Sequence, residues 1–226
     1  MKKILFISLI AAFILSSCKE DSLGVSFMVT YPTMTLKGDV ALTIPVGGTY
    51  TESGCTVKEG DLDLSSLITV SGTVDPTTPG VYTITYTYKN AGKIVPTDSL
   101  EMTARRYVGV INAAAYAMDI SGKYRRNAGA LGYVTVSKTA YPGLYINNNP
   151  GGATSTGTSA GISVDNILIY MFQPTATTVT APSQDSSAGE FACTGGIYDA
   201  TGAAPLFKWV CVNAGYGTAV RTFIKQ

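Results

Sequence analysis

The alternation of side chains over residues 81–88 constrains the fold of this chain more than any other feature. The even-numbered positions from 82 to 88 are Tyr, Ile, Tyr and Tyr, and the odd-numbered positions are Val and three Thr. A period of two is typical of a half-buried β-strand, here with an aromatic inner face. Turn sequences flank it, Pro79-Gly80 before and "KNAGK" after. The segment therefore predicts a strand with one face in a core.

Glycine and proline interrupt the rest of the chain roughly every 8 to 12 residues, as in a secreted all-β protein. Further short β-rich runs are "VALTIPVGG", "SLITVSG", "GYVTVSK", "GLYINN", "SVDNILIYMFQP", "GEFACTGGIYD", "PLFKWVCVNAG" and "AVRTFIKQ". Between them, the alanines of residues 108–119, "VGVINAAAYAMD", allow a short helix. No N-cap residue or long periodicity supports that helix.

Two of these runs, "DNILIYMF" and "LFKWVCV", are apolar on both faces. Such strands are expected in the middle of a sheet that is buried on both sides. A closed barrel or a sandwich would provide that burial, and both remain open. Residues 147–161, "NNNPGGATSTGTSAG", show no apolar period and predict a mobile loop. Either a binding role or a solvated insertion without one fits this loop.

The amino terminus has the organisation of a secretory signal peptide. Lys2 and Lys3 precede an apolar run from Ile4 to Leu15, and small residues lead to Cys18. The run is shorter than the about 20 residues that a transmembrane helix needs. We expect residues 1–17 to be a signal peptide and residues 18–23 to be a tether.

The segment "LSSC" resembles the lipobox of bacterial lipoproteins. This resemblance implies cleavage before Cys18, lipidation of its thiol and a membrane anchor of several acyl chains, which holds firmly. The following "CKED" is similar to the surface-export signal of Bacteroidetes lipoproteins. It implies a location in the outer membrane, facing the cell exterior; the alternative is a solvated tether.

Composition excludes several classes of function. Charged residues make up 14% of the chain, its formal net charge is +1, and no basic cluster occurs, so nucleic-acid binding is not expected. The chain has no histidine, the commonest general base and metal ligand, and no CxxC pair. We expect no cofactor and no metal. Cys193 and Cys211 fall in one domain and either form a disulfide or remain buried free thiols.

Residues 50–93 resemble the bacterial immunoglobulin-like repeat of surface proteins. The shared features are a Gly-Asp segment, "VSGTVD", "PGVYTITY" and an altered hairpin "NAGKIVP". The resemblance implies an immunoglobulin-like β-sandwich of about seven strands over residues 24–107, with a spacer or adhesive role. Asp61 and Asp63 could bind calcium, but they lack a full loop pattern.

Residues 108–226 then predict a second antiparallel β-sandwich or barrel. Their pattern "ISGKYRRNAG", "GLYINN", "GG" and "KWVCVN" is similar to the end domains of small Bacteroidetes lipoproteins encoded beside glycan-uptake systems. The resemblance implies an accessory glycan-binding lipoprotein of a starch-utilisation-type system. Its partners would be a polysaccharide or oligosaccharide and an outer-membrane glycan importer.

Aromatic side chains near turns are the candidate binding residues, because sugar rings stack on exposed aromatic faces. Most tyrosines of β domains belong to the core instead. The candidates are Tyr141, Tyr145, Tyr198, Trp209 and Tyr216. We expect Trp209 to be a core anchor, but we keep it among the candidate binding residues because it is the only tryptophan of the chain.

An enzyme is the least expected class. A glycosidase needs two carboxylates at a set spacing, and no motif marks a pair among the acids of residues 108–226. A serine hydrolase would lack a histidine base. The sequence therefore predicts polysaccharide binding in support of glycan uptake, with a structural or adhesive spacer, such as a fimbria-like subunit, as the alternative.

Overall fold

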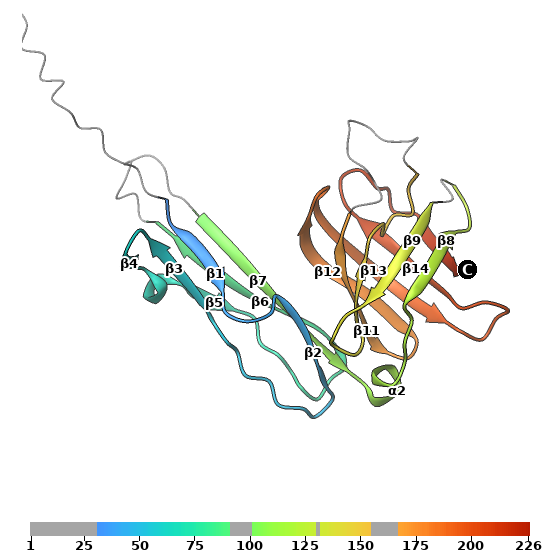
Figure 1. Cartoon of the computed structure of the whole chain (residues 1–226), viewed down its shortest axis with the longest axis horizontal. Coiled ribbons are helices and arrows are strands. Elements are labelled where there is room, and N and C mark those ends of the chain that lie inside the picture. Colours follow the sequence, from blue (N-terminus) through green and yellow to red (C-terminus); the bar gives the residue numbers. More distant parts are fainter. Residues whose placement is uncertain (1–30, 91–100, 130–131, 155–166) are drawn as a thin grey trace, which may run out of the picture. The chain divides into compact units, whose positions relative to one another are not determined.

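The computed structural model describes residues 31–90, 101–129, 132–154 and 167–226, and it is all-β. Cys18 and the residues of the signal peptide and tether lie outside this part. Figure 1 shows two groups of strands, β1–β7 and β8–β15, which are called here the Ig-like region and the barrel. In the described part of the chain, no helix has the length and apolar character needed to cross a membrane.

The Ig-like region has two sheets, in the orders β1-β3-β4 and β2-β7-β6-β5. All neighbouring strands are antiparallel except β2 and β7, which are parallel. The seven strands expected from the sequence are present. They are β1 (Thr33–Leu36), β2 (Ala41–Pro45), β3 (Cys55–Glu59), β4 (Leu62–Asp63), β5 (Thr69–Ser71), β6 (Gly80–Lys89) and β7 (Glu101–Ile111), with a 3₁₀ turn, η1 (Ser65–Leu67), between β4 and β5.

Strand β6 alternates as predicted. Ile84, Tyr86 and Tyr88 are buried, and the threonines between them are partly exposed. Ile84 and Tyr86 join Cys55 of β3 in an apolar cluster that connects the two sheets. The aromatic face of this strand is therefore core.

Strand β7 runs past the predicted boundary at residue 107 and ends at Ile111. Its last six residues, 106–111, are all buried. The division of the chain into residues 24–107 and 108–226 stays a prediction.

After β7, the short helix α2 (Ala113–Tyr116) does form, because the Asn112 side chain accepts a 2.8 Å hydrogen bond from the Ala115 N–H and caps it. The expectation that no N-cap is present was wrong.

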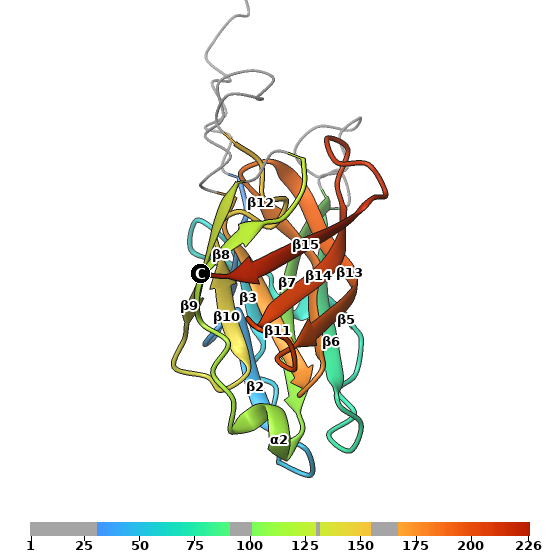
Figure 2. The ribbon, with the colours of Figure 1, turned by 90° about the vertical axis from the view of Figure 1, so that its right-hand side faces the viewer.

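The barrel settles the choice between sandwich and barrel for the second half. Eight antiparallel strands close in the order β10-β11-β12-β13-β14-β15-β8-β9. Figure 2 shows β15 beside β14 and β8, the pairings that complete the ring. The strands are β8 (Gly122–Arg126), β9 (Tyr133–Lys138), β10 (Leu144–Asn147), β11 (Ile169–Thr175), β12 (Thr178–Ser186), β13 (Gly189–Asp199), β14 (Leu206–Val212) and β15 (Val220–Lys225).

Strand β11 is buried on both faces, as its sequence predicts. Ile169 and Met171 face the barrel core. Phe172 lies in a second cluster with Tyr107 of β7 and Leu144, so the outer face of β11 packs against the Ig-like region. At Gly109 of β7 an added Cβ would lie 2.7 Å from the Phe172 ring, so glycine allows this close approach. Strand β14 differs from its prediction, because Phe207, Trp209 and Cys211 are buried while Val212 is exposed.

In the first half, the sequence analysis covered β1, β3, β4 and β7 only through the implied seven-strand sandwich. In the second half it missed strands β8 and β12, and each has a local reason. Strand β12 contains Pro182, which normally counts against a strand, but the register with β13 shifts between Ala181 and Gln184 and accommodates it. Strand β8, "GKYRR", has an arginine, Arg126, two positions after the buried Tyr124 and so on its side of the strand. A charged side chain at an inward position breaks the expected alternation.

Candidate functional site

Three of the five candidate binding residues lie in the barrel core. Tyr145, Tyr198 and Trp209 are 1%, 5% and 0% exposed. The Trp209 indole N–H donates a 2.9 Å hydrogen bond to the Pro150 carbonyl, and its ring packs edge-on against Phe207. A ring without an open face cannot stack on a sugar, so these three side chains serve the packing of the barrel.

Tyr216 is half-buried at one end of the barrel. Its ring meets the edge of Phe191 at 5.4 Å between centroids, and the Arg221 guanidinium lies 4.9 Å from its centre. Burial raises the pKa of Tyr216. Its surroundings are charged and partly enclosed, and they differ from those of a sugar-stacking platform.

Tyr141 is the candidate that lines a cavity. It lies in the turn between β9 and β10, where its N–H donates to the Thr139 hydroxyl at 3.1 Å. The next residue, Pro142, accepts a 2.7 Å hydrogen bond from the Thr43 hydroxyl of β2. The Tyr141 hydroxyl donates to the Asp39 carboxylate, and this hydrogen bond raises the pKa of Tyr141. The turn is thus held on both sides, with the ring at the edge of the Ig-like region.

The cavity beside Tyr141 has a volume of about 320 Å³. It combines two tyrosine rings, an apolar floor, three hydroxyl side chains and one carboxylate. Its lining residues are Gly38, Asp39, Leu42, Ile44, Thr49, Tyr50, Thr51, Ser53, Arg106 and Tyr141. Pockets that bind small organic ligands start at about this size and have this mixture of apolar walls and a few polar groups.

The buried Arg106, which is paired with the partly exposed Glu52, lines the inner wall of this cavity. Arg106 of β7 is 1% exposed, and its Nε donates to Glu52 Oε1 at 2.9 Å. Its other nitrogens donate to the carbonyls of Lys37 at 2.5 Å, of Gly54 at 3.3 Å and of Asp39. The guanidinium therefore ties residues 37–39 and 52–54 to strand β7 and shapes the cavity.

Tyr50 completes this network by donating its hydroxyl to Glu52. Burial and that hydrogen bond raise the pKa of Tyr50. Burial alone would raise the pKa of Glu52, but the hydrogen bonds led by that of Tyr50, together with the Arg106 charge, hold it below its ordinary value. Glu52 is therefore ionised at neutral pH and balances Arg106, which leaves Asp39 as the carboxylate facing the cavity.

Sequence analysis missed Asp39 and Tyr50 because their region was assigned a spacer role. Asp39 lies 102 residues before Tyr141 in the chain, and no local pattern connects the two. The available signal was "TYTESG", residues 49–54, in which one tyrosine, one glutamate and three hydroxyl side chains fall together outside a strand.

The loop predicted over residues 147–161 is in part structural. Residues 149–152 are buried, as is Asn147. The Asn149 side chain donates to the carbonyls of Tyr133 at 3.0 Å and Ala153 at 2.9 Å. The start of this segment is thus part of the barrel core, which its Asn-Gly composition does not suggest. Residues 155–161 lie outside the described part.

Cys193 and Cys211 face each other in register on β13 and β14, with 3.9 Å between the sulfurs. Both are free thiols and buried, so the second of the two alternatives holds. Burial raises the pKa of Cys193. The Cys193 thiol is therefore inert toward reagents in solution. The hydrogen bond from Cys193 and the charges of Arg221 and Arg126 instead lower the pKa of Cys211.

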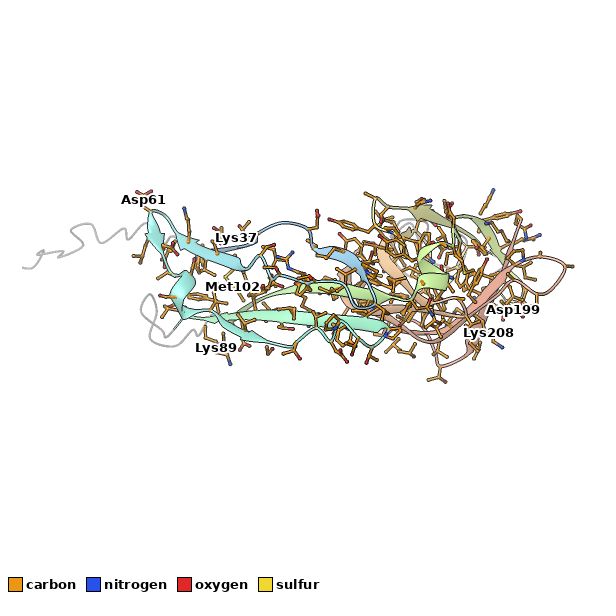
Figure 3. The ribbon with its side chains drawn as sticks, turned by 90° about the horizontal axis from the view of Figure 1, so that it is seen from below. Lys37, Asp61, Lys89, Met102, Asp199 and Lys208 are labelled. Carbon is orange, nitrogen blue, oxygen red and sulfur yellow. The ribbon has the colours of Figure 1, made fainter. Side chains whose placement is uncertain are left out.

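Metal binding and catalysis gain no candidate residues. Figure 3 shows Asp61 at the tip of the β3–β4 turn, and the Asp63 carboxylate accepts the Ser65 N–H at 2.9 Å, which is a turn contact. In the described ranges no three Cys, Asp or Glu side chains group to hold a metal ion. Residues 157–161 spell GxSxG and lie outside these ranges, and the chain has no histidine to activate a serine. That the protein is not an enzyme stays a prediction.

Comparison with known proteins supports the identification of the first half. Residues 34–110 match the family of bacterial surface protein Ig-like domains, as the sequence resemblance implied. A search of curated proteins finds no match. Among solved structures, the chain is similar to a lipoprotein from Bacteroides thetaiotaomicron with 21% identity and a TM-score of 0.37, covering 87% of this chain and 100% of the other. The chain thus carries a bacterial surface protein Ig-like domain at residues 34–110.

Proposed function

We propose that this protein is a lipid-anchored surface protein that binds a neutral polysaccharide in the cavity between Tyr50 and Tyr141 and supports glycan uptake. The observation that carries the proposal is the pairing of these two rings with hydroxyl groups and the Asp39 carboxylate around a cavity of about 320 Å³. Aromatic faces pack on the C–H groups of a sugar, and carboxylate and hydroxyl groups accept or donate hydrogen bonds to its hydroxyls.

The charge of the cavity favours a neutral ligand. Arg106 is matched by Glu52, so the net charge that remains at the wall is that of Asp39. An acidic sugar would be repelled there. The size suits one or two sugar rings of a longer chain. Each stacked ring contributes on the order of 0.5 to 1.5 kcal/mol, so an affinity of roughly micromolar to millimolar is expected.

Replacing Tyr141 by Ala tests the site. The full-length chain is screened against neutral polysaccharides by affinity electrophoresis, and ligands that bind are then titrated calorimetrically. Tyr141→Ala is expected to lower affinity about tenfold, because it removes one stacking face and the hydroxyl that orders Asp39. Its midpoint of thermal unfolding should change little, since Tyr141 is partly exposed.

Tyr133→Ala is the matched control, because Tyr133 is a 48% exposed tyrosine on β9 that does not line the cavity. It should leave affinity unchanged. Equal losses for the two variants would exclude the cavity as the site. If the intact protein binds none of the polysaccharides, the spacer or adhesive role becomes the better proposal.

Cys18→Ala tests the surface anchor. The lipobox-like "LSSC" supports lipidation at this thiol, and the surface Ig-like domain supports an exported location. The variant should leave the membrane fraction and appear in soluble fractions of fractionated cells. Protease treatment of intact cells then reports whether the parent faces the exterior. A variant as fully membrane-bound as the parent contradicts the anchor.

The spacer alternative has one structural consequence. Structural subunits that assemble by strand addition need an open sheet edge. The end strands of the two Ig-like sheets in the described ranges, β1, β4, β2 and β5, have four, two, five and three residues. Such short edges protect a sheet against pairing with another chain, which favours the binding role.

A further inference from the structure

Two arginines lie at one end of the barrel. Arg126 is the last residue of β8, and Arg221 is the second residue of β15. The two strands pair with Arg126 opposite Phe223, and positions two apart on a strand share a face. Arg221 therefore shares the inward face of β15 with the buried Phe223, and Arg126 shares that of β8 with the buried Tyr124.

Among the residues that the structure describes, Arg221 is buried without a carboxylate partner, and its polar side-chain neighbour is the Cys211 thiol. The arginine is 7% exposed, one of its nitrogens donates to the Ala219 carbonyl at 3.2 Å, and its Nε has no hydrogen-bond acceptor. A buried charge without a partner is strongly unfavourable, so a structural role alone does not account for it.

Arg126 also has no carboxylate partner within residues 31–90, 101–129, 132–154 and 167–226. One of its nitrogens donates a long, 3.4 Å hydrogen bond to the Gly151 carbonyl. Burial and the nearby charge of Arg221 lower the pKa of Arg126, so the two positive charges are close enough to repel each other. The four ion pairs of the described residues involve neither arginine.

The backbone around the two arginines is closely packed. A Cβ added at Gly151 would lie 2.1 Å from the Tyr216 ring, and one added at Gly152 would lie 3.0 Å from the Arg126 side chain. Gly151 thus lies directly against the Tyr216 side chain, and Gly152 against that of Arg126. Tyr216 is further fixed by the Phe191 ring, and Arg221 lies over its face. The charged groups are held in place before any ligand arrives.

We propose that Arg126, Arg221 and Tyr216 form a binding site for an oxyanion, the carboxylate or sulfate group of a ligand. A guanidinium offers planar pairs of N–H donors that match two oxygens of such a group. The free Nε of Arg221 and the unpaired charge of Arg126 supply those donors. The site shares no residue with the cavity of Tyr50 and Tyr141 and does not depend on the proposed polysaccharide binding.

Thermal unfolding of the full-length chain tests this site. The midpoint is measured in sodium chloride, in sodium sulfate at equal ionic strength, and with oligogalacturonate. Sulfate stabilises proteins in general, so the informative quantity is the difference between variants. Replacing chloride by sulfate should raise the unfolding midpoint of the parent by more than it raises the midpoint of Arg221→Gln. Calorimetry should show that Arg221→Gln binds sulfate at least about tenfold more weakly than the parent does.

Arg125→Gln is the matched control. Arg125 is the exposed neighbour of Arg126, on the opposite side of β8, and the substitution removes the same charge. Sulfate should raise the unfolding midpoint of Arg125→Gln as much as it raises that of the parent. Arg221→Gln should also unfold no earlier than the parent in chloride, because it removes an unpaired buried charge. Both results are expected only if the anion acts at the barrel end.

Comparing sulfate with oligogalacturonate shows whether the site takes a free anion or the carboxylate of an acidic sugar. A response to sulfate alone assigns the site to free anions, and a response to oligogalacturonate as well assigns it to acidic sugars. Equal responses of the parent and Arg221→Gln would overturn the site. Asp165→Asn removes an acid of residues 155–166. If sulfate raised the unfolding midpoint of this variant but not that of the parent, the arginines would be assigned to an ion pair within the chain, and the oxyanion site would be overturned.

Discussion

Arg106 in the Ig-like region and Arg221 in the barrel are both buried, but their surroundings differ. Arg106 donates to one carboxylate and three backbone carbonyls. Arg221 donates to one carbonyl, faces the Tyr216 ring and has a free Nε. Burial by itself therefore does not reveal the role of a charged residue. The complete set of partners accounts for the buried charge of Arg106, and the incomplete set at Arg221 is the basis of the proposed oxyanion site.

The two regions also differ in what stabilises their cores. The buried cluster that joins the two Ig-like sheets is small, Cys55, Ile84 and Tyr86, and an ion pair lies nearby. The barrel core contains seventeen buried apolar residues, including the contacting rings of Phe207, Trp209 and Phe223. We expect the Ig-like region to be sensitive to loss of charge and the barrel to loss of aromatic volume.

Glu52→Ala should have the largest effect on stability. It leaves Arg106 buried without a carboxylate, which typically costs about 3 to 5 kcal/mol. Because Glu52 is partly exposed, the lower end, about 3 kcal/mol, is expected. Urea unfolding of the full-length protein measures the loss. Glu101→Ala is the control, since its pair with Lys89 is exposed and should contribute at most about 1 kcal/mol. Similar losses for the two variants would contradict the structural role of Arg106.

Trp209→Phe should have an intermediate effect. It removes the 2.9 Å hydrogen bond to the Pro150 carbonyl and some ring volume, for a loss of about 1 to 2 kcal/mol. Within the same barrel, Arg221→Gln should cost nothing, although both side chains are buried. The free energy of unfolding of both variants in chloride decides this. A larger loss for Arg221→Gln would show that the arginine stabilises the barrel.

The pH dependence of stability should show the smallest effect. The pKa of Glu52 is lowered in the folded protein, so its contribution is present above the ordinary value of 4.5 and is lost as pH falls through the folded pKa. Glu52→Gln should therefore be less stable than the parent at pH 7, and the difference should shrink below pH 4.5. Arg221→Gln should show no such trend between pH 3 and 7, because none of the ion pairs of the described residues joins Arg221 to a carboxylate. If the difference in unfolding free energy between Glu52→Gln and the parent did not change with pH, the lowered pKa of Glu52 would be contradicted.

Much of the fold followed from local pattern. The alternation around Tyr86 gave β6, and the run containing Trp209 gave β14, since a strand records its inner face in every second residue. Strand β8 was missed because Arg126 occupies an inward position, and β12 because a bulge accommodates Pro182. Both exceptions depend on neighbours from other parts of the chain.

The candidate site was predicted only in part. Of the four turn-borne tyrosines and Trp209, Tyr141 lines the cavity, while its partners Asp39 and Tyr50 come from the region to which the sequence assigned a spacer role. A turn position favours exposure, but Tyr145 and Tyr198 show that a core position can lie directly beside a turn. Exposure depends on what covers a residue, and local sequence does not contain that information.

The sequence by itself determined the all-β class and the positions of most strands, because side-chain alternation and turn residues act over a few residues. The immunoglobulin-like first half followed from the resemblance of residues 50–93 to a known repeat. Only the tertiary structure decided that the second half closes into a barrel, that the outer face of β11 is covered by the Ig-like region, and which buried arginine is paired. Arg106 meets Glu52 across 54 residues of chain, and Arg221 lies 95 positions from Arg126. Such contacts depend on where distant strands meet, and that is fixed by packing and closure of the whole chain.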